Sequence, residues 1–237
     1  VNDGYSVQPL LAAMRSKHDL ERRGATRTFA QYFYFALSHP EYLRALLARV
    51  SDPDLLVRIQ ATKALWRWYY RDQDPRVRSS ILDAILGRMA REPSADERLN
   101  LSQALYTILD DNTVLLYDYW LPAMSKEEDR QDTQAAQYEH EMLLASKIAP
   151  ALGQGNADQK EAILDAFGYY FLRAEIGNDY DYITFYNPNA ADLMVDPLLK
   201  LLNDPSPGIR VKALKAAVAA RGAHDVRLKA AVLRSSM

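Results

Sequence analysis

Two stretches of this 237-residue chain are nearly alike: SDPDLLVRIQATKAL at residues 51–65 and NDPSPGIRVKALKAA at residues 203–217. Each contains Asp-Pro, an arginine five residues after that proline, and small or apolar residues eight, eleven and twelve residues after it. A partial copy follows Pro93, and degenerate copies follow Gly155 and Lys17. Recurrence of one short pattern along a chain is typical of a solenoid built from similar units.

The spacing within each copy predicts a helix with one buried face. Positions eight, eleven, twelve and fifteen after the starting residue are i, i+3, i+4 and i+7 of one helical face. In the copy that starts at Pro53 they are Ala61, Ala64, Leu65 and Trp68. An apolar stripe also precedes each copy, as in EYLRALLARV at residues 41–50. We therefore expect an all-α fold: a curved α-solenoid of about five helical hairpins plus a C-terminal helix.

The Asp-Pro pair predicts how the second helix of each hairpin begins. Asp is a favoured N-cap residue, and Pro is tolerated in the first turn because no hydrogen-bonding N–H is lost there. Asp52 and Asp204 are therefore expected to cap second helices. Ser94 with Glu97 has the spacing of a capping box.

The pattern Asp-Pro-x-x-x-apolar-Arg-x-x-Ala-x-x-Ala-Leu resembles the HEAT repeat, a helical hairpin of roughly 40 residues. Residues 52–65 match it closely, residues 204–216 nearly as well, and residues 92–105 in part. The resemblance implies no single activity, because adaptors, transport factors, assembly chaperones and a few enzymes use this repeat. It does imply a ladder of polar contacts between stacked units. The expected ladder residues are Ser16 and Arg22, Asp52 and Arg58, Glu92 and Arg98, Gln154 and Lys160, and Asp204 and Arg210.

The intervals between copies indicate one repeat domain over residues 1–237 with two insertions. The starting residues lie 36, 40, 62 and 50 positions apart, which leaves extra chain near 111–132 and near 176–192. Insertions in a solenoid often serve binding. The second insertion carries Tyr180, Tyr182 and Tyr186, which either form a recognition loop or pack back onto the array.

The outward face of the second helices, expected to line the concave side, is the other candidate binding surface. Its polar, cationic and aromatic positions are Arg27, Tyr34, Lys63, Arg67, Tyr70 and Lys215. Tyr and Arg are typical anchors of protein interfaces. The alternative is an ordinary solvated helix face.

The C-terminal segment AHDVRLKAAVLRSSM predicts one more helix on the fifth hairpin. Val226, Ala230 and Leu233 are spaced i, i+4 and i+7 and are expected to form its buried face. No further helix follows to cover its other side, and solenoids normally end in a polar capping unit. We expect that the chain continues beyond Met237 or that another subunit covers this end.

Several chemical classes are disfavoured by the residues present. The chain has no cysteine, which excludes disulfides and Cys-ligated zinc and fits either a reducing or an oxidising compartment. No apolar run is long enough to span a bilayer. The four histidines are scattered, and no HExxH, GxSxG, Walker A or EF-hand pattern occurs. We expect no catalytic residue, cofactor or metal site.

Charge argues against nucleic acid as the partner. The net charge is −2, and residues 111–197 carry 16 Asp and Glu against 5 Lys and Arg. A phosphate-binding groove needs a coherent set of cations. The sequence therefore favours a non-catalytic scaffold that binds a partner protein. The alternatives are a HEAT-like accessory module of a larger enzyme or redox protein and, less favoured, a nucleic-acid-binding helical repeat.

Overall fold

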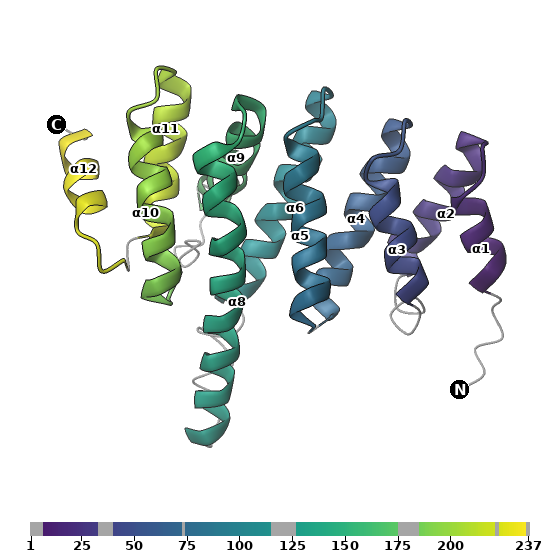
Figure 1. The fold of residues 1–237 in the computed structure, drawn as a ribbon, viewed down its shortest axis with the longest axis horizontal. Helices are drawn as coiled ribbons and strands as arrows, with labels where there is room; N and C mark the ends of the chain where they lie inside the picture. The colour runs from purple at the N-terminus through teal and green to yellow at the C-terminus, as the bar shows by residue number, and fades with distance from the viewer. Residues whose placement is uncertain are drawn as a thin grey trace.

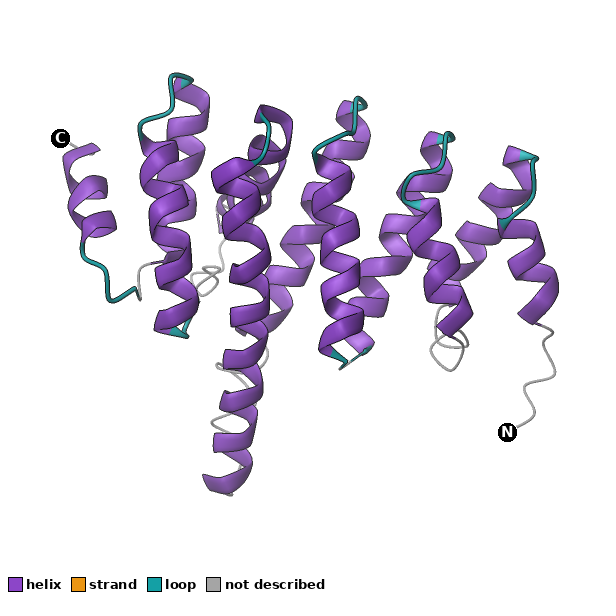
Figure 2. Ribbon diagram, viewed as in Figure 1, coloured by secondary structure: helices purple, strands orange, loops and turns teal. Residues whose placement is uncertain are grey.

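The computed structural model of the chain describes residues 7–32, 40–72, 74–114, 127–174, 185–220 and 223–235. Across these ranges the backbone forms eleven α-helices and one 3₁₀-helix, without a strand (Figure 2). The helices are α1 (Val7–Met14), α2 (Asp19–Tyr32), α3 (Pro40–Arg49), α4 (Leu55–Arg71), α5 (Pro75–Met89), α6 (Ala95–Val114), α8 (Glu127–Gln154), α9 (Ala157–Ala174), α10 (Pro188–Leu202), α11 (Pro207–Ala216), η3 (Ala217–Ala220) and α12 (Arg227–Ser235). The prediction of an all-α solenoid is confirmed.

The helices pair into five hairpins that stand side by side in one row, followed by α12 (Figure 1). The hairpins are α1–α2, α3–α4, α5–α6, α8–α9 and α10–α11. The second helices form a continuous layer, in which α2 packs on α4, α4 on α6, α6 on α9 and α9 on α11. The first helices α3, α5, α8 and α10 lie nearer the viewer in Figure 1. The N-terminal part of α8 extends beyond the row.

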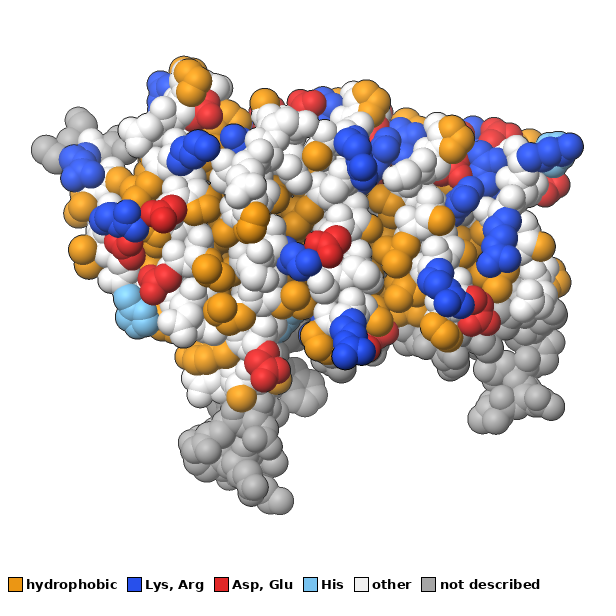
Figure 3. All heavy atoms as spheres, in the orientation of Figure 1, with side chains coloured by type: hydrophobic (Ala, Val, Ile, Leu, Met, Phe, Trp, Pro, Cys, Tyr) orange, Lys and Arg blue, Asp and Glu red, His pale blue; other side chains and the backbone are white. Residues whose placement is uncertain are grey.

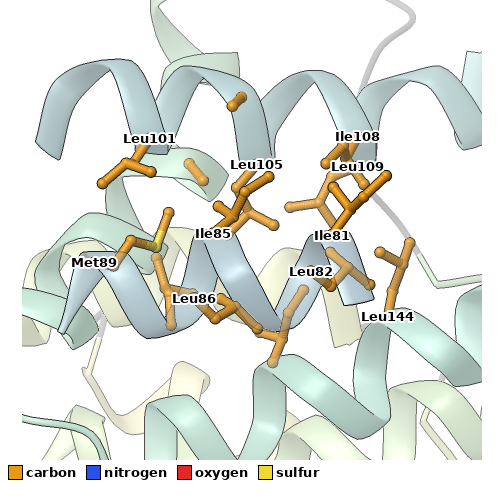
Figure 4. Close-up of a cluster of buried hydrophobic side chains, with 14 of the residues drawn as sticks. Ile81, Leu82, Ile85, Leu86, Met89, Leu101, Leu105, Ile108, Leu109 and Leu144 are labelled. Atoms are coloured by element: carbon orange, nitrogen blue, oxygen red, sulfur yellow. The ribbon is translucent and has the colours of Figure 1, made fainter. Parts of the chain in front are cut away.

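The predicted buried face of the second helices is confirmed. Ala61, Ala64 and Leu65 are completely buried, and Trp68 is nearly so. The small alanines allow α4 to lie close between α2 and α6. Figure 4 shows the equivalent packing one unit further on, where the apolar side chains of α5 and α6 interlock and Leu144 of α8 joins them. Each such leucine or isoleucine contributes about 1.5–3 kcal/mol of transfer free energy.

The caps differ from the prediction. The N-cap of α4 is Asp54, whose side chain accepts from the Val57 N–H, and the N-cap of α11 is Ser206, followed by Pro207 at the first helical position. Asp52 is not a cap because its buried carboxylate is bound by arginines and by the Asp54 N–H. The Asp-Pro pair therefore shapes the turn before the helix rather than its first turn.

The predicted capping box is half formed. Ser94 Oγ accepts from the Glu97 N–H at 3.4 Å. The Glu97 carboxylate does not return to the Ser94 N–H, which donates instead to Glu92 at 2.9 Å. Glu97 is turned inward and is completely buried.

The predicted phase of the C-terminal helix is wrong. Val226 and Leu233 are 68% and 67% exposed, whereas Leu228 is buried against the array. The helix begins at Arg227, after a turn in which the Asp225 N–H donates to Asp192 of α10. This anchor rotates the helix so that Leu228, rather than Val226, faces inward.

The two predicted insertions fall largely outside the described residues. Of residues 111–132, the structure places 111–114 in α6 and 127–132 in α8. Of residues 176–192, it places 188–192 in α10, and Phe185 and Asn187 before them are buried. None of the helices described is both long enough and apolar enough to cross a bilayer.

Candidate interaction surface

The second helices are held in register by a ladder of arginine–carboxylate pairs. Arg22 donates from Nε and Nη2 to Asp52 at 2.9 and 3.0 Å, and Arg58 donates likewise to Glu92, at 3.0 Å from both nitrogens. Each pair joins the second helix of one hairpin to the turn of the next. Such forked contacts are geometrically specific as well as strong. The predicted ladder is confirmed here, and each arginine reaches the carboxylate of the following unit.

Each arginine also donates to the backbone carbonyl of the residue six positions before it. Arg22 donates to the carbonyl oxygen of Ser16 at 3.0 Å, and Arg58 donates to that of Asp52 at 3.0 Å. Each guanidinium therefore binds the backbone of the turn in its own hairpin and the carboxylate in the turn of the next hairpin. Arg210 repeats the local half of this arrangement on the Asp204 carbonyl at 2.7 Å.

The two ladder carboxylates are fully buried and remain charged because each has several donors. Burial alone would raise the pKa of Asp52, but hydrogen bonds from Arg22 and from the Asp54 N–H lower it below its ordinary value. The pKa of Glu92 is also lowered, by the Ser94 N–H and by Arg88 and Arg58, against the effect of burial. Arg49 and Arg88, at the ends of the first helices, are the second cations of the two sites.

The ladder changes between the third and fourth hairpins. Arg98 donates to the Glu92 carbonyl at 2.7 Å, but the following turn offers the neutral Gln154 where Asp52 and Glu92 stand in earlier turns. Neutral contacts join these hairpins instead. Asn156 and Gln159 donate to the carbonyls of Ala90 and Leu86 at 2.6 and 2.8 Å.

Glu97 is a buried carboxyl that the sequence analysis assigned only to a cap. It accepts from the Thr62 hydroxyl at 3.2 Å and from the Asn100 amide at 3.3 Å. None of the arginine side chains that the structure describes binds it directly, and burial raises its pKa to about 7. The equivalent residue of the preceding hairpin is Val57, which is also completely buried.

An exposed surface with both apolar and cationic side chains lies on α2, α4 and α6. We call it the second-helix face and define it by Leu20, Arg27, Leu56, Lys63 and Leu99. The three leucines are 71%, 48% and 49% exposed, and both cations are exposed. The leucines lie on the second helices of three consecutive hairpins, and exposed apolar side chains that gather on one surface often mark interaction sites.

The spacing on α2 and α4 is the same. Arg27 follows Leu20 by seven residues and Lys63 follows Leu56 by seven. Seven residues are nearly two turns, so each cation lies on the same side as its leucine and about 10 Å further along the helix. Packed helices are separated by about 8–10 Å. The two packed helices therefore present the same arrangement of one leucine and one cation.

The surface changes character at the fourth hairpin. At the positions equivalent to Leu99 and Gln103, α9 carries Glu161 and Asp165. Lys212 of α11 binds both carboxylates at 2.7 Å. These charges are paired within the array, so the second-helix face ends at α6.

The predicted binding residues are placed unequally. Arg27, Lys63 and Lys215 are exposed on second helices. The Arg67 guanidinium donates to the carbonyl oxygen of Ala30 in the preceding hairpin and is half-buried. Tyr186 is half-buried beside α10. Tyr34, Tyr180 and Tyr182 lie outside the described residues, and the side chain of Tyr70 in α4 does so as well.

A second group of buried polar residues joins α4, α5 and α8. The Tyr69 hydroxyl is hydrogen-bonded to His140 Nε2, and the Arg78 guanidinium lies 5.4 Å from the Tyr69 ring centroid. Burial, with the nearby Arg78 charge, lowers the pKa of His140 to about 3, and burial raises that of Tyr69. Both side chains are enclosed, which suits a structural role. Sequence analysis missed this pair because the partners are 71 residues apart.

Next to His140, the Glu141 carboxyl is also buried. It accepts from the Asn187 N–H at 2.6 Å and from the Gln137 amide at 3.1 Å. Burial raises its pKa above the ordinary value, and these donors oppose that effect. The hydrogen bond between Asn187 and Glu141 holds the chain just before α10 against α8. Within the described residues, no cluster of His, Asp and Glu is arranged to hold a metal ion.

Comparisons with known proteins place the chain in no family. No family model matches it, and no curated protein matches its sequence. Among solved structures it is similar to a designed armadillo repeat protein, at 16% identity over 91% of this chain and 100% of the other, with a TM-score of 0.39. It is also similar to an engineered protein, at 17% identity over 92% and 97% of the two chains, with a TM-score of 0.37. Both TM-scores are low, so these likenesses carry no inference about family or function.

Proposed function

We propose that this chain is a non-catalytic, HEAT-like scaffold that binds a partner protein through the second-helix face of its first three hairpins. One observation carries the proposal: Leu20, Leu56 and Leu99 are exposed on consecutive helices beside the exposed cations Arg27 and Lys63. Exposed apolar side chains that gather on one surface often mark a site of protein interaction. The five hairpins and the arginine ladder support the HEAT-like assignment.

The surface favours a partner segment with both apolar and acidic side chains. The leucine side chains bury apolar surface when the partner binds. Arg27 and Lys63 attract acidic groups of the partner and fix its register on the face. A partner helix with an apolar residue and an acidic residue seven positions apart fits this arrangement. The rigid ladder beneath keeps the face preorganised, which lowers the entropic cost of binding.

The proposal is tested by photo-crosslinking in the native host. A benzophenone amino acid replaces Leu56 at the centre of the face. We expect a discrete protein adduct, and we expect the Arg27→Glu and Lys63→Glu changes together to abolish it. The matched control combines Lys229→Glu with Arg234→Glu, which reverses the charge of two exposed cations of α12 and should leave the adduct intact.

Two outcomes would contradict the proposal. A folded protein that gives no discrete adduct would mean that the face is only solvated. An adduct degraded by nuclease would instead favour the nucleic-acid alternative, which predicts retardation of duplex DNA with a steep dependence on salt. An adduct with an enzyme or redox protein would support the scaffold and identify it as an accessory module.

A further inference from the structure

Arg98 of α6 is a ladder arginine that binds no carboxylate in the described part of the chain. Its Nη1 donates to the Glu92 carbonyl at 2.7 Å, just as Nη1 of Arg58 donates to the Asp52 carbonyl at 3.0 Å. In Arg58 this contact leaves Nε and Nη2 to bind the Glu92 carboxylate, whereas the same two nitrogens of Arg98 have no acceptor among the described residues. Arg98 is half-buried and neither nitrogen is fully enclosed, so both can be reached from solvent.

The turn of the fourth hairpin supplies a second donor. In the third hairpin the Ser94 N–H, two residues after the ladder carboxylate Glu92, binds that carboxylate at 2.9 Å, and the second hairpin has the same contact at 3.0 Å. The equivalent N–H belongs to the exposed Asn156, and within the described residues it also has no acceptor. The Asn156 side chain donates to the Ala90 carbonyl at 2.6 Å. This contact holds the fourth turn against the turn that contains Glu92.

Gln154 does not fill the place of the missing carboxylate. Asp52 and Glu92 are buried, whereas Gln154 is exposed. Helix α8 continues to Gln154, so only two residues separate it from α9, where five separate α3 from α4 and α5 from α6. Gln154 instead lines a groove between α8 and α10, together with Lys200.

The other charged groups near this joint leave Arg98 without an opposite charge. The upper edge of the array in Figure 3 carries the short turns within the hairpins, and Lys and Arg side chains are exposed along it. Asp96 and Asp158 are exposed in the first turns of α6 and α9, but neither forms an ion pair with Arg98. A donor without a protein partner generally meets water or a ligand.

We propose that Arg98 and the Asn156 N–H bind a carboxylate group from outside the array, in the place that Asp52 and Glu92 occupy at the earlier joints. A carboxylate accepts two parallel hydrogen bonds from the edge of a guanidinium, and the backbone N–H supplies a third. The group is either the side chain of Asp or Glu in a partner protein or a small free carboxylate. Once bound, it joins the third hairpin to the fourth as the buried carboxylates join the earlier hairpins. Neither Arg98 nor Asn156 belongs to the second-helix face.

The test is a titration of the full chain, labelled with nitrogen-15, at constant ionic strength. The probes are propionate, acetyl-Gly-Glu-Gly-amide and its neutral counterpart acetyl-Gly-Gln-Gly-amide. We expect both carboxylates to shift the Arg98 Nε–H and Asn156 N–H signals along one saturable curve. Binding should be about tenfold tighter than at the exposed Arg91, which is the scale of one additional charge-assisted hydrogen bond.

The probes also separate the two sources of the carboxylate. Tighter binding of the glutamate peptide than of propionate would assign the site to a partner protein, and equal binding would assign it to small carboxylates. The glutamine peptide should shift neither signal, because its amide is neutral and offers a single acceptor.

Variants test the role of the guanidinium, with the Asn156 N–H signal as the readout. Arg98→Lys keeps the charge and loses the fork, so it should weaken propionate binding about tenfold. Arg98→Gln should abolish it. Arg210→Lys is the matched control, because Arg210 makes the same local contact on the Asp204 carbonyl at 2.7 Å but lies in the fifth hairpin. It should leave the titration unchanged.

Three results would overturn the proposal. These are binding at Arg98 no tighter than at Arg91, a shift at Arg98 without one at Asn156, or equal propionate binding in the unaltered chain and the Arg98→Lys variant. Should that variant fail to fold, the comparison of Arg98 with Arg91 in the unaltered chain still decides. Failure here leaves the second-helix face untouched, because its crosslinking test does not involve Arg98 or Asn156.

Discussion

Arg58 and Glu92 belong to consecutive hairpins, and their side chains form a forked ion pair with both N–O distances at 3.0 Å. The Glu92 carboxylate is fully buried, and Arg58 retains only 9% of its side-chain exposure. A buried pair of this kind is costly to break, because the Glu92 carboxylate loses one of its two cations without regaining water.

Arg58→Ala should therefore destabilise the protein by about 2–3 kcal/mol in chemical denaturation, because Glu92 keeps Arg88 as a partner. Arg98→Ala is the matched control. Arg98 occupies the same position one hairpin later but faces Gln154 instead of a carboxylate, so its loss should cost about 1 kcal/mol. Equal losses in the two variants would mean that the cross-hairpin fork adds nothing to the local contact.

Glu97 should make the protein less stable as pH rises. Its folded pKa of about 7 lies above the ordinary value of 4.5, so the folded state holds this proton more tightly than the unfolded chain does. The resulting stability is fully present below pH 4.5 and is lost as pH rises through 7. The decline should approach about 3 kcal/mol above pH 8.

Glu97→Gln removes this ionisation and should flatten the stability profile between pH 5 and 8, as measured by urea denaturation. The exposed Glu139→Gln serves as the control and should leave the profile unchanged. A decline of the same size in Glu97→Gln would assign the effect to another group.

His140 should impose the opposite dependence. Its folded pKa of about 3 lies below the ordinary 6.5, so the stability that it contributes is present above pH 6.5 and is lost as pH falls toward 3. The contribution of Glu97 to folding stability grows as pH falls over part of this range and would mask the effect of His140. The measurement should therefore be made in the Glu97→Gln variant. Adding His140→Gln should then reduce the loss of stability between pH 6.5 and 4.5, whereas replacing the exposed His18 should not.

Ala64→Leu should destabilise the array by about 1–3 kcal/mol, because Ala64 is completely buried where α4 packs between α2 and α6. Lys63→Leu places the same side chain one residue away on the exposed side and should change stability by less than about 0.5 kcal/mol. The melting temperatures of the two variants provide the comparison. Similar values would mean that the alanine contact is looser than the structure indicates.

The architecture was predictable because its signal repeats. The small and apolar positions from Ala61 to Trp68 recur in several copies, and periodic burial is the part of a fold that sequence expresses most directly. The ladder followed from the same recurrence, since Arg22 and Arg58 occupy equivalent positions. What failed was local: the α12 phase depended on the contact of the Asp225 N–H with Asp192, 33 residues earlier.

The surroundings of individual side chains were harder to predict from the sequence than the helices were. The backbone carbonyl of Ala30 positions Arg67. Because every residue has such a carbonyl, the sequence does not reveal this contact. Glu97 and His140 look like ordinary helix residues in the sequence, and only the neighbouring hairpins bury them. Leu20 and Leu56 are apolar residues that the array leaves exposed, which only their place in the folded layer reveals.

The loss of the ladder carboxylate at Gln154 has a mechanical consequence. A joint between hairpins that contains a buried arginine–carboxylate pair resists bending more than a joint that lacks one. The first three hairpins are joined by buried ionic forks, and the joint to the fourth relies on neutral hydrogen bonds and the surface pair of Lys147 with Asp83. Under load, or when a large partner docks, we expect the first three hairpins to move as one stiff unit and the joint between α6 and α9 to bend more readily than the joints within that unit.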